Sequence, residues 1–547
     1  MKTQLIAVLV FLAHLCHAQI EGNWNGELDT QSMKLPVILK ISKTSKGYTA
    51  TLVSPNQSSK EIPVDKISFN NDELTFDIEN LRAGYKGTYK TDHFEGDFLQ
   101  NGRKMTLNFY RNAQSESSNT PDVPYLNGKA INTQKIDDFL NYMVQNNQAI
   151  GSISIFKNGS EVYHKDFGQQ LLSNVSYNKN TGYQIGSISK LITAVMLLQL
   201  VEQGKLSLTD PLSKFYPDIS NAKKITIRHM LNHTSGLGDY VGKTGGNWLF
   251  DQPVGDQAII AAIKKQGVSF KPGEKTRYSN SAYFLLSRIL EKIHEKPYHQ
   301  ILKENILAKV SMPHTFSVLD HSKNVFKSYE LKNNTWSEVK DFNFQNCIGL
   351  GDITSTPEDL NIFINALFNG KFIKKETLDM MISNKNEKFF GLGIMKIPFY
   401  NITIYGHGGD TAGSHSTVGF EPTDQLSYAV TINGEKFNHN SFYLALLNLI
   451  YDRDYKYPVF GQATAPAPEL EKYVGDYTSK DIDMGLKVFV KEGTLYGQGT
   501  NQAEFTLTST GKDQFTFDKA GLKLVFMPEN NQLKLTQGDK TFLFNKK

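Results

Sequence analysis

The chain has 547 residues, of which 39% are hydrophobic and 21% are charged. This balance is typical of a globular protein that is long enough to hold more than one domain. The net charge of +4 is spread along the sequence. Without a basic stripe or a polybasic cluster, the sequence favours neither a nucleic-acid partner nor stable membrane insertion.

The first eighteen residues have the layout of a signal peptide. Lys2 is followed by an apolar run from Leu5 to Leu15, and Ala18 is a small residue at a suitable cleavage point. A lipoprotein signal would want a small residue before Cys16, and a leucine stands there. We therefore expect export to the periplasm or the medium, with cleavage after Ala18. Cleavage would leave Cys347 as the one cysteine, so no intramolecular disulfide is expected.

Residues 22–111 alternate between apolar and polar side chains in short bursts, such as Val37-Leu39-Ile41 and Leu74-Phe76-Ile78. Turn signals separate the bursts, which predicts an all-β module, either a small barrel or a curved sheet. Residues 112–126 are rich in serine, asparagine and proline and are predicted to be a linker.

Residues 127–455 mix helical and strand patterns. Apolar residues at helical spacing predict a helix over 133–147 and an amphipathic helix over 281–294. Asn158-Gly159 between two strand-like runs predicts a β-hairpin, and 402–406 reads as a strand. Helices interleaved with hairpins predict an α+β domain with an antiparallel sheet flanked by helices.

Residues 456–468 form a second predicted linker, and 469–547 a second all-β module, predicted to be a small barrel. Both modules begin alike, with Gly22-Asn23-Trp24-Asn25-Gly26 in one and Tyr473-Val474-Gly475-Asp476-Tyr477 in the other. Two copies of one kind of barrel is a hypothesis that this similarity alone is too thin to establish. The modules are also candidate surfaces for carbohydrate or for oligomer contacts.

The chain is organised around a serine that precedes a buried helix. Residues from Leu191 to Val201 are apolar nearly all the way round, which predicts a helix enclosed by protein. Ser187 and Lys190 lie three residues apart, on one face of its first turn. A lysine there gains nothing from the helix dipole. Serine three residues before lysine occurs six times, but only Ser187 follows a glycine and opens a long buried helix.

A serine hydroxyl is a poor nucleophile unless a base accepts its proton. Lys190 could be that base if it were neutral, which requires lowering its pKa by roughly three units, or about 4 kcal/mol. Burial and the helix dipole are able to supply much of that. From these residues alone, the alternative stays open that Ser187 caps the helix and Lys190 extends into solvent.

Three motifs follow one another in an order known from one family. They are Gly186-Ser187-Ile188-Ser189-Lys190, then Tyr278-Ser279-Asn280, then His407-Gly408-Gly409. From about Asn127 to Tyr455, the chain resembles the penicillin-recognising serine hydrolases: class C β-lactamases, D-Ala-D-Ala carboxypeptidases and related esterases. The resemblance implies a β-lactamase/transpeptidase-like domain. Supporting phrases are His233-Thr234-Ser235-Gly236-Leu237, Lys271-Pro272-Gly273 and Ser355-Thr356-Pro357-Glu358-Asp359-Leu360.

The resemblance also implies catalytic roles. Ser187 would attack an acyl carbon and form an acyl-enzyme, while Lys190 and Tyr278 would share the work of the general base. A tyrosine needs a nearby cation to serve as a base near neutral pH, and Lys190 would be that cation.

The resemblance implies substrate-binding roles for other residues. Asn280 would hydrogen-bond the substrate amide or the lysine. His407-Gly408-Gly409 would end the edge strand of the site, and the backbone N–H groups of Ser187 and Asp410 would form the oxyanion hole. β-Lactamases have a lysine where this chain has His407, and histidine is charged only part of the time near neutral pH. Peptidase or esterase activity is therefore expected in preference to penicillinase activity.

The predicted function is that of an exported serine hydrolase acting on an amide or ester: a D-amino-acid peptide, an ester or a β-lactam-like compound. The alternative is a weakly acylating or non-catalytic sensor of cell-wall peptides or β-lactams. No cofactor or metal is expected, because the thirteen histidines show no metal-ligand spacing. The expected partner is a small-molecule or peptide substrate, with residues 239–270 as a candidate wall of its cleft. The sequence leaves the oligomeric state open.

Overall fold

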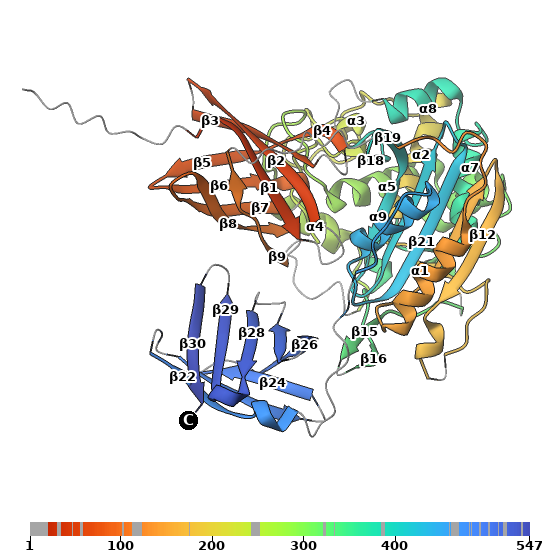
Figure 1. The fold of residues 1–547 in the computed structure, drawn as a ribbon. Helices are drawn as coiled ribbons and strands as arrows, with labels where there is room; N and C mark the ends of the chain where they lie inside the picture. Colours follow the sequence, from red (N-terminus) through yellow and green to blue (C-terminus); the bar gives the residue numbers. More distant parts are fainter. Residues whose placement is uncertain are drawn as a thin grey trace, which may run out of the picture. The chain divides into compact units, whose positions relative to one another are not determined.

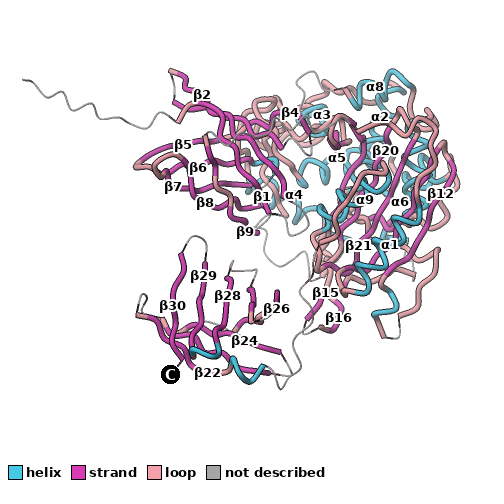
Figure 2. The backbone as a smooth tube through the Cα atoms, viewed as in Figure 1, coloured by secondary structure: helices cyan, strands magenta, loops and turns pink. Residues whose placement is uncertain are grey.

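The computed structural model describes residues 20–546, with gaps at 30–33, 46, 55–57, 82, 101–102, 112–122, 174, 242–251, 321–323, 333, 384–388, 459, 461–469, 481, 483, 492–493, 501–503, 512, 518–521 and 538–539. The predicted signal peptide and most of both predicted linkers therefore lie outside the described residues. So does Gly245-Gly246-Asn247-Trp248 of the predicted cleft wall. The two terminal segments form β-sheets, and residues 123–460 form a mixed unit of helices and strands (Figures 1 and 2).

The N-terminal sheet has the order β4-β3-β2-β1-β10-β8-β7-β6-β5, with β9 beside β8. Its first strand therefore pairs with the second and with the last. Val37, Leu39 and Ile41 are buried on one face, as their period-two spacing predicts. The strands are β1 Gly22–Asp29, β2 Lys34–Thr44, β3 Gly47–Ser54, β4 Ser58–Pro63, β5 Lys66–Asn70, β6 Glu73–Ile78, β7 Ala83–Tyr89, β8 His93–Gln100, β9 Arg103–Thr106 and β10 Phe109–Tyr110.

The C-terminal sheet has the order β25-β24-β23-β22-β30-β29-β28-β27-β26. Its first strand, too, pairs with the second and with the last. The strands are β22 Gly475–Ser479, β23 Gly485–Lys491, β24 Thr494–Gly499, β25 Phe505–Thr506, β26 Thr508–Gly511, β27 Gln514–Phe517, β28 Leu522–Met527, β29 Gln532–Gln537 and β30 Lys540–Lys546.

The two terminal sheets share more than their strand order. In β1, Trp24 Nε1 donates a hydrogen bond of 2.8 Å to the carbonyl of Ile20, four residues earlier. In β22, Tyr477 Oη donates one of 2.9 Å to the carbonyl of Tyr473, also four residues earlier. Each aromatic follows a glycine by two residues. The shared order and the shared anchor support the hypothesis that the modules are two copies of one kind of sheet.

The central unit is built on an antiparallel sheet of order β12-β11-β21-β20-β19-β18, with β15 beside β21 and β16 beyond it. The predicted hairpin joins β11 to β12, and Asn158 and Gly159 both have positive φ (52° and 78°) in its turn. The strands are β11 Ala149–Lys157, β12 Ser160–Phe167, β15 Tyr329–Lys332, β16 Thr335–Glu338, β18 Met395–Phe399, β19 Ile402–Asp410, β20 His415–Glu421 and β21 Leu426–Glu435.

Helices cover both faces of this sheet (Figure 1). On one face, α1 (Thr133–Gln145) and α9 (His439–Ile450) pack on Ile402 and Ile404 of β19. On the other, α2 (Ile188–Glu202) and α7 (Pro357–Phe368) pack on Val418 and Phe420 of β20. The remaining α-helices are α3 Ile227–Leu231, α4 Asp256–Gln266, α5 Asn280–His294, α6 Tyr298–Leu302 and α8 Lys375–Ile382. The predicted α+β class, with a flanked antiparallel sheet and all-β modules at both ends, is confirmed.

Helix α2 is enclosed as predicted, because its residues from Ile188 to Leu200 are all buried. A small sheet of order β13-β17-β14 aligns its N-terminal end. β13 (Tyr183–Gln184), which leads into Ser187, pairs with β17 (Ile353–Ser355), and β14 is Phe316–Ser317. The small sheet thus brings the segment before α2 beside the segment before β17. Among the described residues, no helix is long and apolar enough to cross a membrane.

Candidate active site

Gly186 lets the segment before α2 approach the end of β19. Its φ is +50°, a region that side chains with a Cβ rarely adopt. A Cβ at this position would also lie 2.8 Å from the carbonyl oxygen of Asp410 and 2.9 Å from its nitrogen. The backbone of Asp410 therefore lies directly against the residue that precedes Ser187.

Ser187 and Lys190 contact each other at the start of α2. Lys190 Nζ donates hydrogen bonds of 2.9 Å to Ser187 Oγ and 2.9 Å to the carbonyl oxygen of Leu350. Ser187 occupies the N-cap position but makes no capping hydrogen bond with its side chain, and the Lys190 side chain is fully buried. The alternative of a capping serine and an outward lysine is therefore wrong.

Burial lowers the pKa of Lys190 to about 7, against the opposing effect of the carboxylates of Asp239 and Asp410. An ammonium loses its hydration there, and among the described residues no carboxylate forms a hydrogen bond with Nζ to compensate. The aromatic rings of Tyr278 and Tyr283 have their centroids 4.9 Å and 5.9 Å from Nζ. Near neutral pH, a large fraction of Lys190 is therefore the free amine, the form that can accept a proton.

The Lys190 amine is held by a loop that the sequence motifs did not indicate. Leu350 follows Gly349, which has a φ of +77° and whose carbonyl accepts a 2.7 Å hydrogen bond from Thr193 of α2. Asp352 Oδ1 accepts one of 2.6 Å from the Gly349 N–H. Burial raises the pKa of Asp352 to about 6. Glycines and an aspartate just before a strand are the signal that might have identified this loop.

Tyr278 lies on the turn before α5, stacked on His233. The two ring centroids are 4.4 Å apart at an interplanar angle of 29°. His233 is buried, its Nδ1 accepts a 3.2 Å hydrogen bond from the Ser279 N–H, and burial holds its pKa well below the usual range. This neutral imidazole packs against one face of the Tyr278 ring. The sequence motifs contain His233 but do not predict its contact with Tyr278.

Asn280, the first residue of α5, is fixed by Asp239. Its backbone N–H and its side-chain Nδ2 both donate to Asp239 Oδ2, at 3.3 Å and 3.1 Å. A carboxylate is favourable at a helix N-terminus. Asn280 was predicted to bond either the substrate amide or Lys190. In the structure its hydrogen bonds go to Asp239 and not to Lys190. Asp239 begins the predicted wall of the cleft, but the sequence does not predict its contact with Asn280.

His407 is 2% exposed on β19, and burial lowers its pKa to about 4. The imidazole is therefore neutral at physiological pH. Its Nδ1 lies 2.6 Å from the carbonyl oxygen of Gly408, which can only accept, so Nδ1 carries the proton and Nε2 is an acceptor. Among the described residues, Nε2 has no hydrogen-bond partner. The position held by a lysine in β-lactamases is thus occupied by an uncharged acceptor.

The end of β19 has an open edge beside Ser187. β18 pairs with β19 only as far as Gly406, and the hairpin to β20 places the N–H of Thr411 on the β20 side. Because strand N–H groups alternate between the two edges, the N–H of Asp410 faces the open edge. A Cβ at Gly409 would collide with the carbonyl oxygen of Ile185. The predicted oxyanion donors therefore lie on adjacent segments in close contact.

One group of described side chains could offer ligands to a metal. Asp410, His415 and His439 place ligand atoms within 4.8 Å of one another, although the histidine spacing predicted no such group. Asp410 and His415 lie at the two ends of the turn in the β19–β20 hairpin, and His439 is the first residue of α9. His415 Nδ1 is 2.7 Å from Asp410 Oδ1, and its Nε2 is 2.7 Å from Glu435 Oε2. Both ring nitrogens are thus already paired with carboxylates.

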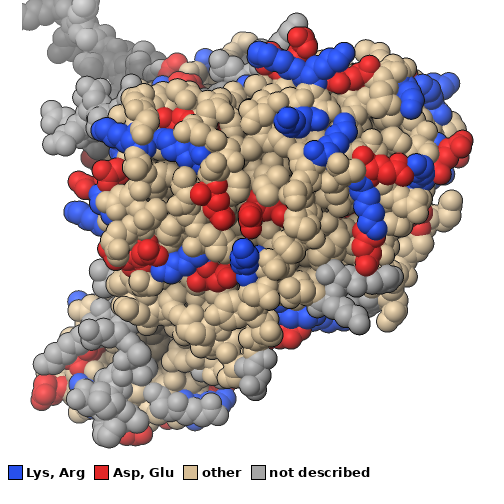
Figure 3. Space-filling model, turned by 90° about the vertical axis from the view of Figure 1, so that its right-hand side faces the viewer, with Lys and Arg blue, Asp and Glu red and all other residues tan. Residues whose placement is uncertain are grey.

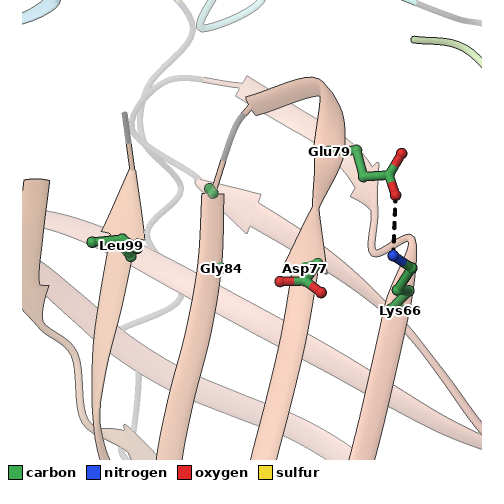
Figure 4. Close-up of a pocket in the computed structure, with 6 residues that line it drawn as sticks. Lys66, Asp77, Glu79, Gly84 and Leu99 are labelled. Atoms are coloured by element: carbon green, nitrogen blue, oxygen red, sulfur yellow. Dashed lines mark ion pairs between the residues drawn. The ribbon is translucent and has the colours of Figure 1, made fainter. Parts of the chain in front are cut away.

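Two other surfaces show nothing comparable. On the face shown in Figure 3, acidic and basic side chains are interspersed. In the N-terminal sheet, a depression lies beside the ion pair of Lys66 and Glu79, whose charged atoms are 3.3 Å apart (Figure 4). The residues that line it include no serine, cysteine or histidine. This depression therefore presents no nucleophile with a base.

Comparison with known proteins gives a consistent result. The family model described as Beta-lactamase matches residues 136–452, more than half of the chain. A putative penicillin-binding protein, PbpX, of Bacillus subtilis is 28% identical over 251 residues, which are 45% of this chain and 62% of that protein. A teichoic acid D-alanine hydrolase of Staphylococcus aureus is 28% identical over 244 residues, which are 44% of this chain and 59% of the hydrolase. The chain thus spans about three-fifths of each relative.

A solved structure shows the same fold. The D-amino acid amidase of Ochrobactrum anthropi, complexed with D-phenylalanine, superposes with a TM-score of 0.53 at 22% identity. The superposition covers 58% of this chain and 99% of the amidase.

Proposed function

Because the chain belongs to the beta-lactamase family and is a serine hydrolase, we propose that it cleaves esters or amides of D-amino acids through an acyl-enzyme at Ser187. The observation that carries this proposal is the contact between Ser187 Oγ and a fully buried lysine amine at 2.9 Å. Burial depresses the pKa of that lysine far enough for it to act as a base. The alternative of a non-catalytic sensor gives no reason for such a costly arrangement.

The proposed reaction begins when the Lys190 amine accepts the proton of Ser187 as Oγ attacks the acyl carbon. The N–H groups of Ser187 and Asp410 stabilise the resulting oxyanion. Collapse of the tetrahedral intermediate breaks the bond to the leaving group, which takes the proton from Lys190, directly or through Tyr278. Water then attacks the acyl-enzyme and gives a proton to the same base. The second tetrahedral intermediate breaks the bond to Ser187 Oγ, which takes that proton back from the base as the carboxylic acid product leaves.

The charges of the site favour an amino-acid derivative over a β-lactam. A β-lactam or a peptide with a free C-terminus presents a carboxylate, and His407 is uncharged where β-lactamases have a lysine. An amino-acid ester or amide carries an ammonium instead. His407 Nε2 as an acceptor and the carboxylate of Asp239 beside Asn280 suit that group. The named activities of the teichoic acid D-alanine hydrolase and the D-amino acid amidase lie in the same class.

Labelling with a fluorophosphonate probe tests the nucleophile. We expect wild type and Ser220→Ala to be labelled equally, and Ser187→Ala not at all. Ser220 is a matched control because it also precedes a lysine by three residues but is exposed. Equal labelling of Ser187→Ala would refute the assignment.

A substrate panel tests the proposed class. D-alanine methyl ester and D-phenylalanine amide should be hydrolysed faster than their L-enantiomers and faster than nitrocefin. Nitrocefin as the best substrate would refute the class but not the nucleophile.

Export is a separate proposal, supported by the signal-like residues 1–18. N-terminal sequencing of the protein from its native host should begin at Gln19. Recovery of the protein with its first eighteen residues would contradict it.

A further inference from the structure

The backbone and the side chain of Asp410 lie in two different environments. Its backbone N–H faces the open edge of β19 beside Gly186, whereas its side chain points to the sheet face covered by α9. Alternation along the strand places Ile402, Ile404 and Asp410 on that face, and the two isoleucines pack in the core of α1 and α9. Whatever holds the Asp410 side chain therefore also holds the amide on the other side.

A chain of ionic hydrogen bonds holds this side chain. His415, directly across the β19–β20 hairpin from Asp410, bonds Asp410 Oδ1 through Nδ1 and Glu435 Oε2 through Nε2, both at 2.7 Å. His439 Nδ1 lies 3.0 Å from the same Glu435 oxygen. The two imidazole rings stack with centroids 3.8 Å apart at 12°. An imidazolium between two carboxylates fits this pattern, because it donates from both nitrogens.

We infer that His415 is a positioning residue, which holds Asp410 through its side chain so that the Asp410 amide stays aimed at the oxyanion. This inference rests on the proposed function, in which that amide is an oxyanion donor. An oxyanion donor is effective only where its N–H meets the developing charge, so a small displacement lowers the rate. The substrate does not touch His415, and binding should therefore change little when His415 is altered.

The rest of the hairpin is held from the other side. Asp341 accepts hydrogen bonds from Thr411 Oγ1 at 2.8 Å and from the Ala412 N–H at 3.0 Å. These bonds secure the turn, and Ser416 Oγ donates a 3.2 Å hydrogen bond to the carbonyl of Gly409, in the same peptide unit as the Asp410 N–H. His415 holds Asp410 through its side chain, from the α9 side of the sheet. Loss of His415 should consequently loosen the amide without unfolding the hairpin.

The charge of His415 depends on its neighbours. Burial lowers its pKa, but the hydrogen bonds to Asp410 and Glu435 outweigh this effect and raise the pKa to about 9. His439 and Tyr443 face the same cluster from α9, and burial raises the pKa of Tyr443, which stays neutral.

The test measures kcat and KM for D-alanine methyl ester from pH 6 to pH 10, with spontaneous hydrolysis subtracted. His415→Gln should lower kcat at pH 7.5 about tenfold and change KM less than about twofold. His415→Arg keeps a cation that can bond two carboxylates. It should restore most of the lost kcat.

His164→Gln is the matched control. His164 lies on β12 between Asp166 and Glu161, whose carboxylates lie 3.9 Å and 3.5 Å from its ring nitrogens and raise its pKa to about 9 as well. It has no connection to β19, and its variant should match wild type in kcat and in pH profile. A tenfold loss of kcat in His164→Gln would overturn the inference, because it would show that losing a histidine–carboxylate pair far from Asp410 has the same effect.

Asp410→Ala removes the same contact from the other partner while keeping the backbone amide, so it replaces His415→Gln if that variant does not fold. The double variant Asp410→Ala/His415→Gln should be no slower than the slower single variant, because both act through one contact. Unchanged kcat in folded His415→Gln would overturn the inference. So would loss of activity in EDTA with recovery on adding zinc, since His415 would then be a metal ligand.

Fluorophosphonate labelling separates the two levels of the argument. Absence of labelling at Ser187 in wild type would overturn the proposed function and, with it, this inference. Labelling that depends on Ser187 but proceeds at the same rate in wild type and His415→Gln would overturn the inference alone.

Discussion

Ionisable side chains on the two faces of strand β19 have pKa values that are shifted in opposite directions. On the face toward α2, Lys190 and His407 are buried without a carboxylate in contact, and burial lowers their pKa values to about 7 and about 4. On the face toward α9, His415 is also largely buried but bonds two carboxylates, and its pKa rises to about 9. Desolvation thus produces bases on one face, whereas paired carboxylates produce a fixed cation on the other.

The partners differ more than the burial does, although the His415 side chain is 23% exposed whereas Lys190 and His407 are 0% and 2% exposed. Desolvation opposes charge on both faces, and only a close, hydrogen-bonded counter-charge reverses its effect. A hydrolase needs both results: a neutral amine next to the nucleophile, and a rigid support for the strand that borders it. The following variants alter one face at a time.

The largest expected effect comes from removing the base. Lys190→Met keeps the apolar stem but has no group that accepts the Ser187 proton. We expect kcat/KM for D-alanine methyl ester to fall about a thousandfold, as in other hydrolases that lose a catalytic group. A fall of less than tenfold would show that another group is the main base, with Tyr278 the first candidate.

The same variant should make the protein more stable. The folded-state pKa of Lys190 lies near 7, against 10.5 for the free side chain, so at pH 7 and below the native state bears the cost of neutralising or burying the charge. This cost disappears as the pH rises toward 10.5. Urea unfolding at pH 7 should show Lys190→Met stabilised by about 2–4 kcal/mol after loss of two hydrogen bonds. A destabilised Lys190→Met would contradict the depressed pKa.

A smaller effect should follow when charge is restored on the α2 face. His407→Lys places a cation where β-lactamases have one, and a cation favours a substrate carboxylate. We expect the rate of acylation by benzylpenicillin, relative to hydrolysis of D-alanine methyl ester, to rise about tenfold. Thermal unfolding of the variant should be measured alongside, and an unchanged ratio in the folded variant would argue against this reading of His407.

The smallest effect is expected at Asp239. Its carboxylate opposes the lowering of the Lys190 pKa, so Asp239→Asn should move the acid limb of the kcat profile to lower pH. The asparagine can still accept the Asn280 hydrogen bonds, and kcat at pH 8 should stay within about threefold of wild type. Displacement of the acid limb to higher pH would contradict this prediction, because it would mean that the Asp239 carboxylate lowers the pKa of Lys190.

Much of the fold could be predicted because the local signals agree with it. The all-apolar run of α2, the Asn158-Gly159 turn and the period-two bursts each specify one structure. The contact between Ser187 and Lys190 follows from helical spacing. The strand order of the terminal sheets could not be predicted, because it depends on pairings between residues far apart in sequence.

The other residues of the site could not be predicted from the sequence for the same reason. Leu350, Asp239 and the His415–Glu435–His439 cluster reach the site or its support from separate loops and strands, without a fixed spacing to the three motifs. The burial that makes Lys190 a base arises from packing of α2 against other elements. A motif can name such a residue, but only the packed structure sets its pKa.

The central claim is that Lys190 is a neutral base at physiological pH. NMR titration of protein labelled with ¹⁵N at the lysine Nζ, with Lys190→Met to assign the resonance, measures this directly. The structure predicts that Lys190 titrates near pH 7, whereas exposed lysines titrate above pH 10. A Lys190 resonance that titrates above pH 10 would contradict the account.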